Sequence, residues 1–276
     1  MFKWLYSVKE TLRTRETTIC GFKFVKPSTI KPHIYDLRTY MMAQSLHKSF
    51  EKYRGIYTGK DIVIVGGGPT VNFYKPLKNT INIGLNLAFR KEDIKFHYLF
   101  MQDEFEFPEY REDFINYQPN DCTKMVGLYS NEAKRRVRQS TIARMKKKEI
   151  YILNNRRPDK SPTLIDITAE PFAWYKGTIF GALQFALFTN PRKIYLIGFD
   201  CDNSGNALVY NEWNWFNHNN QFKWWEMFKD FVDKNYEQNE IISVNPVGLK
   251  GLFKDVYTQS YLDEHPEISK DNVEII

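Results

Sequence analysis

Short apolar runs alternate with amphipathic stretches from residue 61 onward. Seven runs predict buried strands, because they are short, mostly apolar and rich in β-branched or aromatic residues. In chain order they read DIVIVG, TINIGLN, FHYLFMQD, TKMVGLY, EIYIL, RKIYLIGFD and EIISVN. Residues 177–188 and 221–236 instead repeat apolar residues with helical spacing. Strands that alternate with helices predict a Rossmann-like α/β fold with a doubly wound, mostly parallel sheet.

The same pattern divides the chain into three parts. Residues 1–58 show no clear strand periodicity and predict a helical or irregular N-terminal extension. Its start interleaves aromatic and basic residues as an interfacial helix does, and a helix packed on the domain is the alternative. Residues 59–256 form the predicted Rossmann-like domain, and residues 257–276 a C-terminal tail. Within the domain, residues 201–221 predict a lid.

Aromatic residues support the lid prediction. Residues 208–225 hold four of the six tryptophans, beside several Asn and Glu residues. Aromatic rings stack on sugar faces while neighbouring polar groups bond hydroxyls. The alternative is that these rings pack a helix onto the sheet, and we expect this of Trp225.

The glycines at the end of the first predicted strand can be compared with the fingerprint of a dinucleotide-binding enzyme. An NAD fingerprint needs G-x-G-x-x-G and an acidic residue about 20 positions later. Gly66 and Gly68 match the first two glycines, but Val71 replaces the third, and Asn86 stands where the acid belongs. The sequence therefore disfavours NAD.

The turn still suits a phosphate. Gly66, Gly67 and Gly68 allow close backbone approach, and Pro69 and Thr70 begin a predicted helix whose free N–H groups would face the ligand. A tight turn without a ligand is the alternative. In doubly wound sheets, ligands bind beyond the carboxyl ends of the strands. The polar residues at the other predicted strand ends are Asn86, Gln102, Asp103, Asp200, Asp202 and Asn245.

Composition and charge narrow the setting. The chain has 276 residues, 42% of them hydrophobic, enough for one large α/β domain. Its three cysteines share no metal or redox spacing, which predicts a reducing, cytoplasmic compartment. No run of about 18 apolar residues and no signal-peptide pattern occurs.

The formal net charge is +6, and eight basic residues cluster in residues 133–148. A solvated helix face is one explanation for this run. The other is attraction to an anionic partner, such as the inner face of the cell membrane or a phosphorylated glycolipid. Nucleic acid is not an expected partner, since no recognised nucleic-acid motif accompanies the charge.

Two segments resemble a bacterial glycosyltransferase family. FEKYRGIYTGKDIVIVGGGPTV, with the next two predicted strands, is similar to a family opening whose usual turn is G-N-G-P-S. KGTIFGALQFALFTNPRKIYLIGFD is similar to the second motif of that family. The family includes lipooligosaccharide sialyltransferases, motility-associated flagellin glycosyltransferases and related pterin diphosphokinases. The resemblance covers roughly residues 50–245.

The resemblance implies how a nucleotide donor is held. In the sialyltransferases, the glycine turn and the asparagine that ends the second strand bind the monophosphate part of a CMP-sugar. Gly67 stands where the family usually has asparagine, which leaves the nucleotide open. The positions that match the donor site, or lie near it, are Gly66, Gly67, Gly68, Pro69, Thr70, Asn86, Gln102, Asp103, Gly177 and Thr178.

The resemblance also implies a catalytic base. The sialyltransferases use a lid histidine just before a long helix, and His218 lies just before the helix predicted from Gln221. Imidazole suits this role because its usual pKa of about 6.5 leaves it able to accept a proton near pH 7. A loop histidine without a task is the alternative. Tyr210 corresponds to a lid tyrosine that bonds the leaving phosphate.

Asp200 and Asp202 support a second chemistry. A D-x-D pair at a strand end holds Mg²⁺ or Mn²⁺ on a nucleotide diphosphate in many glycosyltransferases, since hard cations prefer carboxylate oxygens. In the sialyltransferases the matching aspartate is not a required metal ligand. If Asp103 and Asp202 lie close together in the fold, this favours a metal-assisted UDP- or GDP-sugar enzyme or a diphosphokinase.

The sequence therefore predicts an inverting glycosyltransferase that requires no cofactor. It would move a sugar, sialic acid or a related one, from a nucleotide donor, with a CMP-sugar favoured, to a hydroxyl of a cell-surface glycan or glycolipid. A metal-dependent diphosphokinase or other phosphate-transfer enzyme on the same scaffold is the alternative. A nucleotide-binding protein without catalysis is a third hypothesis.

Overall fold

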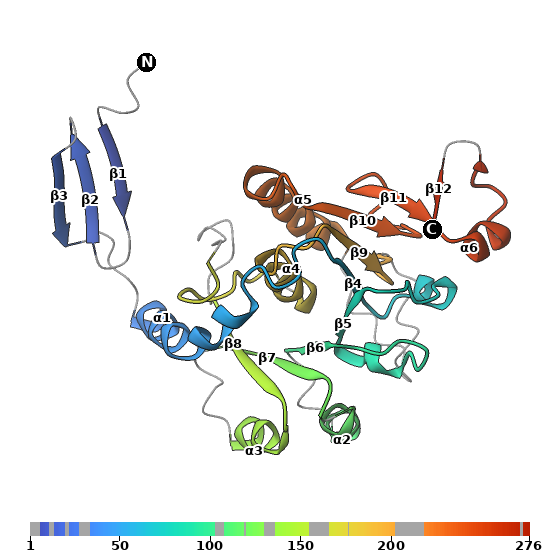
Figure 1. The fold of residues 1–276 in the computed structure, drawn as a ribbon, viewed down its shortest axis with the longest axis horizontal. Helices are drawn as coiled ribbons and strands as arrows, with labels where there is room; N and C mark the ends of the chain where they lie inside the picture. Colours follow the sequence, from blue (N-terminus) through green and yellow to red (C-terminus); the bar gives the residue numbers. More distant parts are fainter. Residues whose placement is uncertain are drawn as a thin grey trace.

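A large parallel sheet forms the centre of the molecule (Figure 1). The computed structural model describes residues 6–10, 14–19, 22–27, 34–102, 108–118, 120–129, 136–154, 166–175, 177–201, 218–270 and 273–276. Within these residues, nine strands pair in the order β12-β11-β10-β9-β4-β5-β6-β7-β8. They are β4 (Asp61–Val65), β5 (Ile81–Leu85), β6 (Tyr98–Met101), β7 (Thr123–Tyr129), β8 (Lys148–Leu153), β9 (Lys193–Ile197), β10 (Glu240–Val244), β11 (Lys254–Tyr257) and β12 (Glu274–Ile275).

The order of the strands makes the sheet doubly wound. The chain enters at β4, proceeds outward through β5 to β8, and then returns to place β9 on the other side of β4. Ile62 of β4 pairs with Ile81 of β5 and with Ile194 of β9, and all strand pairs described in this sheet are parallel. The predicted α/β fold is confirmed. Its switch in direction lies between β4 and β9, where such sheets bind ligands.

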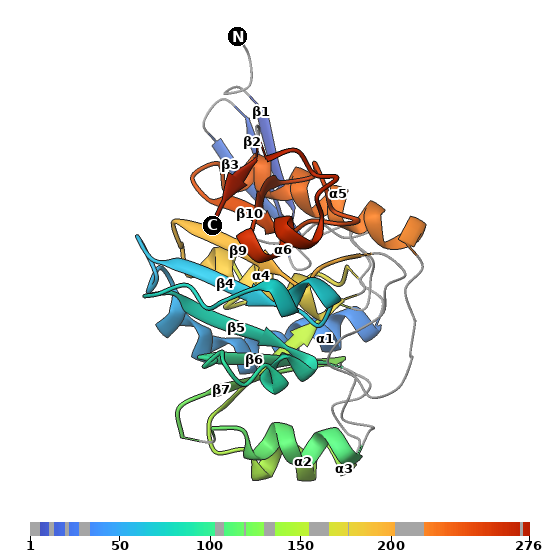
Figure 2. The same ribbon diagram turned by 90° about the vertical axis from the view of Figure 1, so that its right-hand side faces the viewer.

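Helices cover both faces of the sheet (Figures 1 and 2). Alternate residues of each strand enter two separate cores, so Ile62 and Ile64 pack on one face and Val63 and Val65 on the other. The first core includes η1 (His47–Tyr53), α4 (Thr178–Phe188) and α5 (His218–Asn235). The second includes α1 (Ile34–Leu46), η2 (Pro69–Phe73), η3 (Asn86–Arg90), α2 (Pro108–Asn116) and α3 (Arg136–Arg144).

Helix α4 packs directly on the centre of the sheet. All of its residues are buried, and it contacts β4, β5 and β6. Its other side chains beyond the first turn are apolar on every side, as expected for a buried helix, and the one polar side chain there, Gln184, bonds the backbone of Ala173. Its N-terminus is thereby fixed beside the carboxyl ends of the central strands, where β4 and β5 finish. No described helix is long and apolar enough to cross a bilayer.

The two ends of the chain differ from the expected extension and tail. Before α1 and η1 the chain forms a separate antiparallel sheet of β1 (Tyr6–Glu10), β2 (Thr14–Ile19) and β3 (Phe22–Pro27). The prediction of a helical or irregular extension is therefore wrong for this part. Its strands are rich in Thr, Val and Phe, which favour extended backbone over helix. At the other end, α6 (Gln259–Glu264) leads to β12, which pairs with β11 and continues the main sheet.

Candidate functional site

A pocket of about 170 Å³ opens at the switch point of the sheet. Three strand ends, those of β4, β5 and β9, meet here with the first turn of α4. Four predicted site residues line it, namely Gly66, Gly67, Asn86 and Thr178. The other lining residues are Leu85, Leu87, Ala88, Ile179, Gly198 and Phe199.

The glycine turn packs tightly against the turn that follows β9. The amide of Gly66 donates to the carbonyl of Ile197 at 2.8 Å, and that of Gly68 donates to the carbonyl of Gly198 at 2.9 Å. A Cβ on Gly66 would lie 2.6 Å from the Gly198 carbonyl oxygen, and a Cβ on Gly68 would lie 2.7 Å from the Asp200 carboxylate. Packing therefore explains why positions 66 and 68 are glycine, since only glycine fits between these two turns.

Asp200 holds the turn from the neighbouring strand end. Its carboxylate accepts the amide hydrogen of Thr70 at 3.0 Å and also the hydroxyl hydrogen of Thr70, and Asp200 is only 4% exposed. The segment that begins at Pro69 is a 3₁₀ helix of five residues, in which the amide of Val71 donates to the carbonyl of Gly68. The expectation of free N–H groups here is thus wrong for Thr70 and Val71. The amide of Thr70 donates to the Asp200 carboxylate, and that of Val71 donates to the Gly68 carbonyl.

Asn86 has an unusual backbone and an unsatisfied side chain. Its φ is +53°, in the left-handed region that asparagine tolerates better than most residues. Its Oδ1 atom is buried and accepts no hydrogen bond within the described part of the chain. A buried acceptor without a donor costs about 1–3 kcal/mol. Such a group, on a residue that lines a pocket, is a candidate ligand contact.

The N-terminus of α4 supplies positive potential to the same pocket. The helix starts at Thr178, which lines the pocket, and no side chain described here caps it. The first amides of a helix and its dipole together attract anions. Gly177 precedes the helix in an extended conformation, and a Cβ there would have its nearest neighbour at 3.5 Å. The packing of this protein alone therefore does not require glycine at position 177.

The remaining predicted site residues lie elsewhere or outside the described residues. Gln102 is buried, and its side-chain amide donates to the Tyr151 hydroxyl at 3.0 Å, within the packed interior. Asp103, Asp202 and Tyr210 lie outside the described residues. His218 is the first residue of α5, three residues earlier than the predicted helix start, and its side chain is also outside the described part.

Sequence reasoning did not single out Ile179 and Phe199. Both line the pocket, and Phe199 packs edge-to-face on Trp225 with ring centroids 6.0 Å apart. Their types gave no signal, because isolated apolar residues next to a strand end or a helix start are usually core residues. Gly198, at φ +69°, does have a signal, since a glycine directly after an apolar run often marks a left-handed turn.

Two other histidines are committed to structural bonds. His47 is fully buried; its Nε2 accepts the amide hydrogen of Ile152 at 2.8 Å, so Nδ1 carries the proton that it donates to the carbonyl of Glu170 at 2.9 Å. Burial lowers the pKa of His47 to about 4. Nδ1 of His97 accepts the amide hydrogen of Asn82 at 3.1 Å, before β6 and hence at the amino end of the sheet. Neither is placed to act at the pocket.

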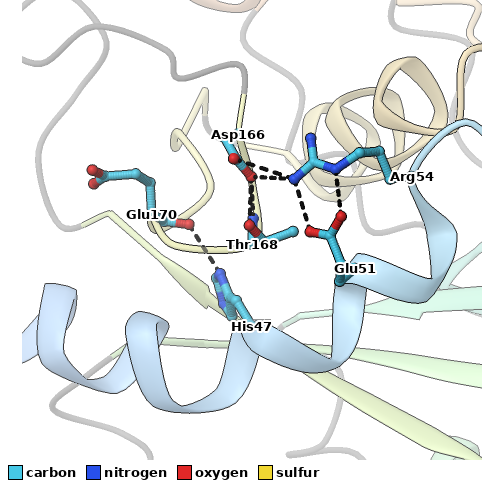
Figure 3. Close-up of polar contacts among 6 residues, drawn as sticks. All are labelled: His47, Glu51, Arg54, Asp166, Thr168 and Glu170. Carbon is cyan, nitrogen blue, oxygen red and sulfur yellow. Dashed lines mark hydrogen bonds and ion pairs between the residues drawn. The ribbon is translucent and has the colours of Figure 1, made fainter.

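A second hollow, of about 720 Å³, lies where α1 and η1 meet residues 166–170. Figure 3 shows that charged groups beside it pair with each other: Arg54 binds both Glu51 and Asp166. Asp166 also accepts the amide and hydroxyl hydrogens of Thr168. Burial and the nearby charge of Asp166 raise the pKa of Glu170 to about 7, and its carboxyl group points away from His47 (Figure 3). These contacts join η1 to the loop and carry no evident chemistry.

Comparison with known proteins finds likeness only among solved structures. The sialyltransferase CstII from Campylobacter jejuni, in complex with the substrate analogue cytidine-5'-monophosphate, is 14% identical with a TM-score of 0.44, over 67% of this chain and 80% of that one. A Tyr-to-Phe variant of sialyltransferase Cst-II in complex with CMP is 13% identical with a TM-score of 0.42, over the same shares. No family model and no curated protein matches the chain.

Proposed function

We propose that this protein is a glycosyltransferase that takes a sugar from a nucleotide-activated donor, with a CMP-sugar favoured, and attaches it to a hydroxyl of a glycan. The observation that carries the proposal is the pocket at the switch point, which is lined by Asn86, a residue whose buried Oδ1 accepts no hydrogen bond from the described residues. This is the place where doubly wound sheets bind nucleotides. The motif resemblance assigns the donor to the same residues.

In this proposal the donor phosphate binds at the N-terminus of α4. Thr178 and Gly67 both line the pocket, and the helix dipole favours a negative group beside Thr178. No Lys or Arg is among the described lining residues, and the attraction that these residues offer comes from backbone amides and the helix dipole. An uncharged cradle of this kind suits a monophosphate better than a diphosphate, which carries more negative charge.

Asn86 reads a hydrogen-bond donor on the nucleotide. Asn86 lines the pocket and its Oδ1 accepts no hydrogen bond from the described residues, so a bond from the ligand to this oxygen displaces no existing one. A ribose hydroxyl or an exocyclic amino group would satisfy it. Satisfying an acceptor that is unpaired in the ligand-free protein adds to affinity, because the cost of leaving it unpaired disappears on binding.

His218 is the proposed general base. In a parallel β-α-β connection the chain leaves a strand at the carboxyl edge, and the following helix begins at that edge. His218 begins the helix that follows β9, so it belongs to the same edge as the pocket. An inverting transfer needs no covalent nucleophile. It needs one base to remove the proton of the acceptor hydroxyl, and a single histidine can act as that base.

No observation on the described residues favours the diphosphokinase alternative. Of the three aspartates that would hold Mg²⁺ or Mn²⁺, only Asp200 is described, and both of its carboxylate oxygens accept hydrogen bonds from Thr70. No cluster of metal-binding side chains occurs among the described residues. Because both carboxylate oxygens of Asp200 already accept hydrogen bonds from Thr70, we propose a transfer that uses no metal at Asp200. The cysteine spacing supports a cytoplasmic location for this transfer.

A thermal-shift panel tests the donor class. CMP, UDP, GDP and ATP are each added with EDTA or with Mn²⁺, and the melting temperature is measured. A ligand that binds only the folded state stabilises it by about 2.7 kcal/mol at 100 times its Kd. We expect the largest shift with CMP, equal in EDTA and Mn²⁺. A shift confined to a diphosphate or triphosphate with Mn²⁺ would instead support the phosphate-transfer enzyme.

A further inference from the structure

The small N-terminal sheet has one apolar face. Its register aligns Tyr6 with Ile19 and Ile19 with Phe22 in one row across the three strands. Residues aligned in this way share a face, and so do residues two positions further along each strand. The next row along this face is Val8, Thr17 and Phe24. Five of these six residues are apolar or aromatic.

The opposite face and the third row are mostly polar. The opposite face holds Ser7, Lys9, Glu16, Thr18, Lys23 and Val25. The third row of the apolar face, next to the connection to α1, is Glu10, Arg15 and Lys26. The apolar rows therefore occupy the end of the sheet far from α1, and a row of two basic residues and one acidic residue flanks them on the side toward the main domain.

No described element of the main domain covers this sheet. Figure 1 shows the three strands standing apart from the main sheet beyond α1, and no other described helix or strand makes extended contact with them. A small sheet needs its apolar face buried to be stable in water. The amphipathic pattern thus indicates a partner for this face.

The charge of this segment selects the kind of partner. Residues 1–33 contain seven Lys or Arg and two Glu, a net charge of +5, whereas the whole chain carries +6. Almost all of the excess positive charge therefore lies in this N-terminal segment. Two copies of this segment would repel each other, whereas an anionic lipid surface offers both an apolar interior for the aromatic rows and negative headgroups for the basic flank.

We propose that the N-terminal sheet is a membrane-docking module whose apolar face lies in the surface of an anionic bilayer. Tyr6, Phe22 and Phe24 occupy the face that enters the lipid, at the depth of the headgroups and first acyl carbons. Arg15 and Lys26, one row further on, meet the lipid phosphates. This docking is independent of the proposed glycosyl transfer, because it uses none of the pocket residues.

Vesicle flotation of the full chain tests the proposal. Phosphatidylcholine vesicles with or without 30 mol% phosphatidylglycerol are the probes, at low and high salt. We expect at least roughly tenfold more protein bound to the anionic vesicles at low salt, since each basic residue near such a surface favours binding about fivefold. Equal binding to both vesicle types, or binding to neither, overturns the proposal, whatever the outcome of any nucleotide or transfer assay.

Two neighbouring residues of β3 provide matched variants. Phe24 and Val25 lie on opposite faces, so Phe24→Gln should lower binding to anionic vesicles at least roughly tenfold, while Val25→Gln should leave it within about twofold. Equal loss in both variants contradicts the assignment of the face, and circular dichroism checks that both retain the wild-type strand content. If the wild type instead binds no vesicles and is a dimer, and Phe24→Gln converts it to a monomer, then a second copy of the chain covers this face.

Discussion

Replacing Asn86 with glycine separates nucleotide binding from stability. Glycine adopts the φ of +53° without strain, and the change removes the buried oxygen that lacks a donor. Removing that oxygen favours the folded protein by about 1 kcal/mol, and the greater freedom of glycine in the unfolded chain costs about the same. We therefore expect the free energy of unfolding of Asn86→Gly to stay within about 1 kcal/mol of wild type.

Nucleotide binding should respond quite differently. The proposed hydrogen bond from the donor to Asn86 is lost, which weakens binding by about 1.4 kcal/mol or more. Isothermal titration calorimetry should therefore show a Kd for CMP that is raised roughly tenfold or more. A loss of stability cannot explain the raised Kd, because we expect Asn86→Gly to be folded to the same extent as wild type.

Asn245 provides the matched control. It also ends a strand, with φ +50°, but its carboxamide is satisfied by Thr258: Oδ1 accepts the Thr258 amide hydrogen at 2.8 Å, and Nδ2 donates to the Thr258 hydroxyl at 3.0 Å. Asn245→Gly leaves these buried groups unpaired and should cost about 2–3 kcal/mol, or roughly 5–10 °C in Tm, with the Kd for CMP unchanged. Equal Kd values in wild type and Asn86→Gly, or a large loss of stability in that variant, would refute the reasoning.

Three further predictions address the turn, the base and a buried histidine. Gly68→Ala should lower the free energy of unfolding by about 2 kcal/mol, because its Cβ would lie 2.7 Å from the Asp200 carboxylate. Gly177→Ala should change the free energy of unfolding by less than about 0.5 kcal/mol. Urea denaturation measures both, and equal losses in the two variants would contradict the prediction. His218→Ala should lower kcat for sugar transfer roughly 100-fold or more with the Kd for CMP unchanged, whereas His265→Ala should leave both unchanged; undiminished transfer by His218→Ala removes it as the base. The folded pKa of His47, about 4, lies below its unfolded value of 6.5, so its contribution is complete above pH 6.5 and falls by up to about 3 kcal/mol as the pH drops toward 4. Urea denaturation across this window should show a shallower loss of stability in His47→Gln than in wild type, and parallel curves would contradict the buried neutral histidine.

The main sheet could be predicted because its signals are local. Runs such as DIVIVG and RKIYLIGFD are short and apolar, and the structure forms β4 and β9 there. Residues 177–188 repeat apolar residues at helical spacing, and α4 covers all but the first. The rule that ligands bind beyond strand ends then indicated Gly66 and Asn86, which do line one pocket.

Contacts between distant parts of the chain could not be predicted. The pairing of Thr70 with Asp200 depends on the return of the chain to β9 beside β4, and no local pattern encodes it. Gln102 follows a strand as a site residue would, yet its amide bonds Tyr151 in the interior. The N-terminal strands are short and bear charged residues on both faces, which obscured their period of two.

The most direct test of the central claim is nucleotide release coupled to sugar transfer. The full chain is incubated with CMP-, UDP- or GDP-activated sugars and a hydroxyl-bearing glycan acceptor, in EDTA or in Mn²⁺, and both products are quantified. We expect release of CMP in step with formation of the glycosylated acceptor, at equal rates in EDTA and Mn²⁺. Release that requires Mn²⁺ and a nucleoside diphosphate sugar, or no transfer from any donor, would contradict this expectation.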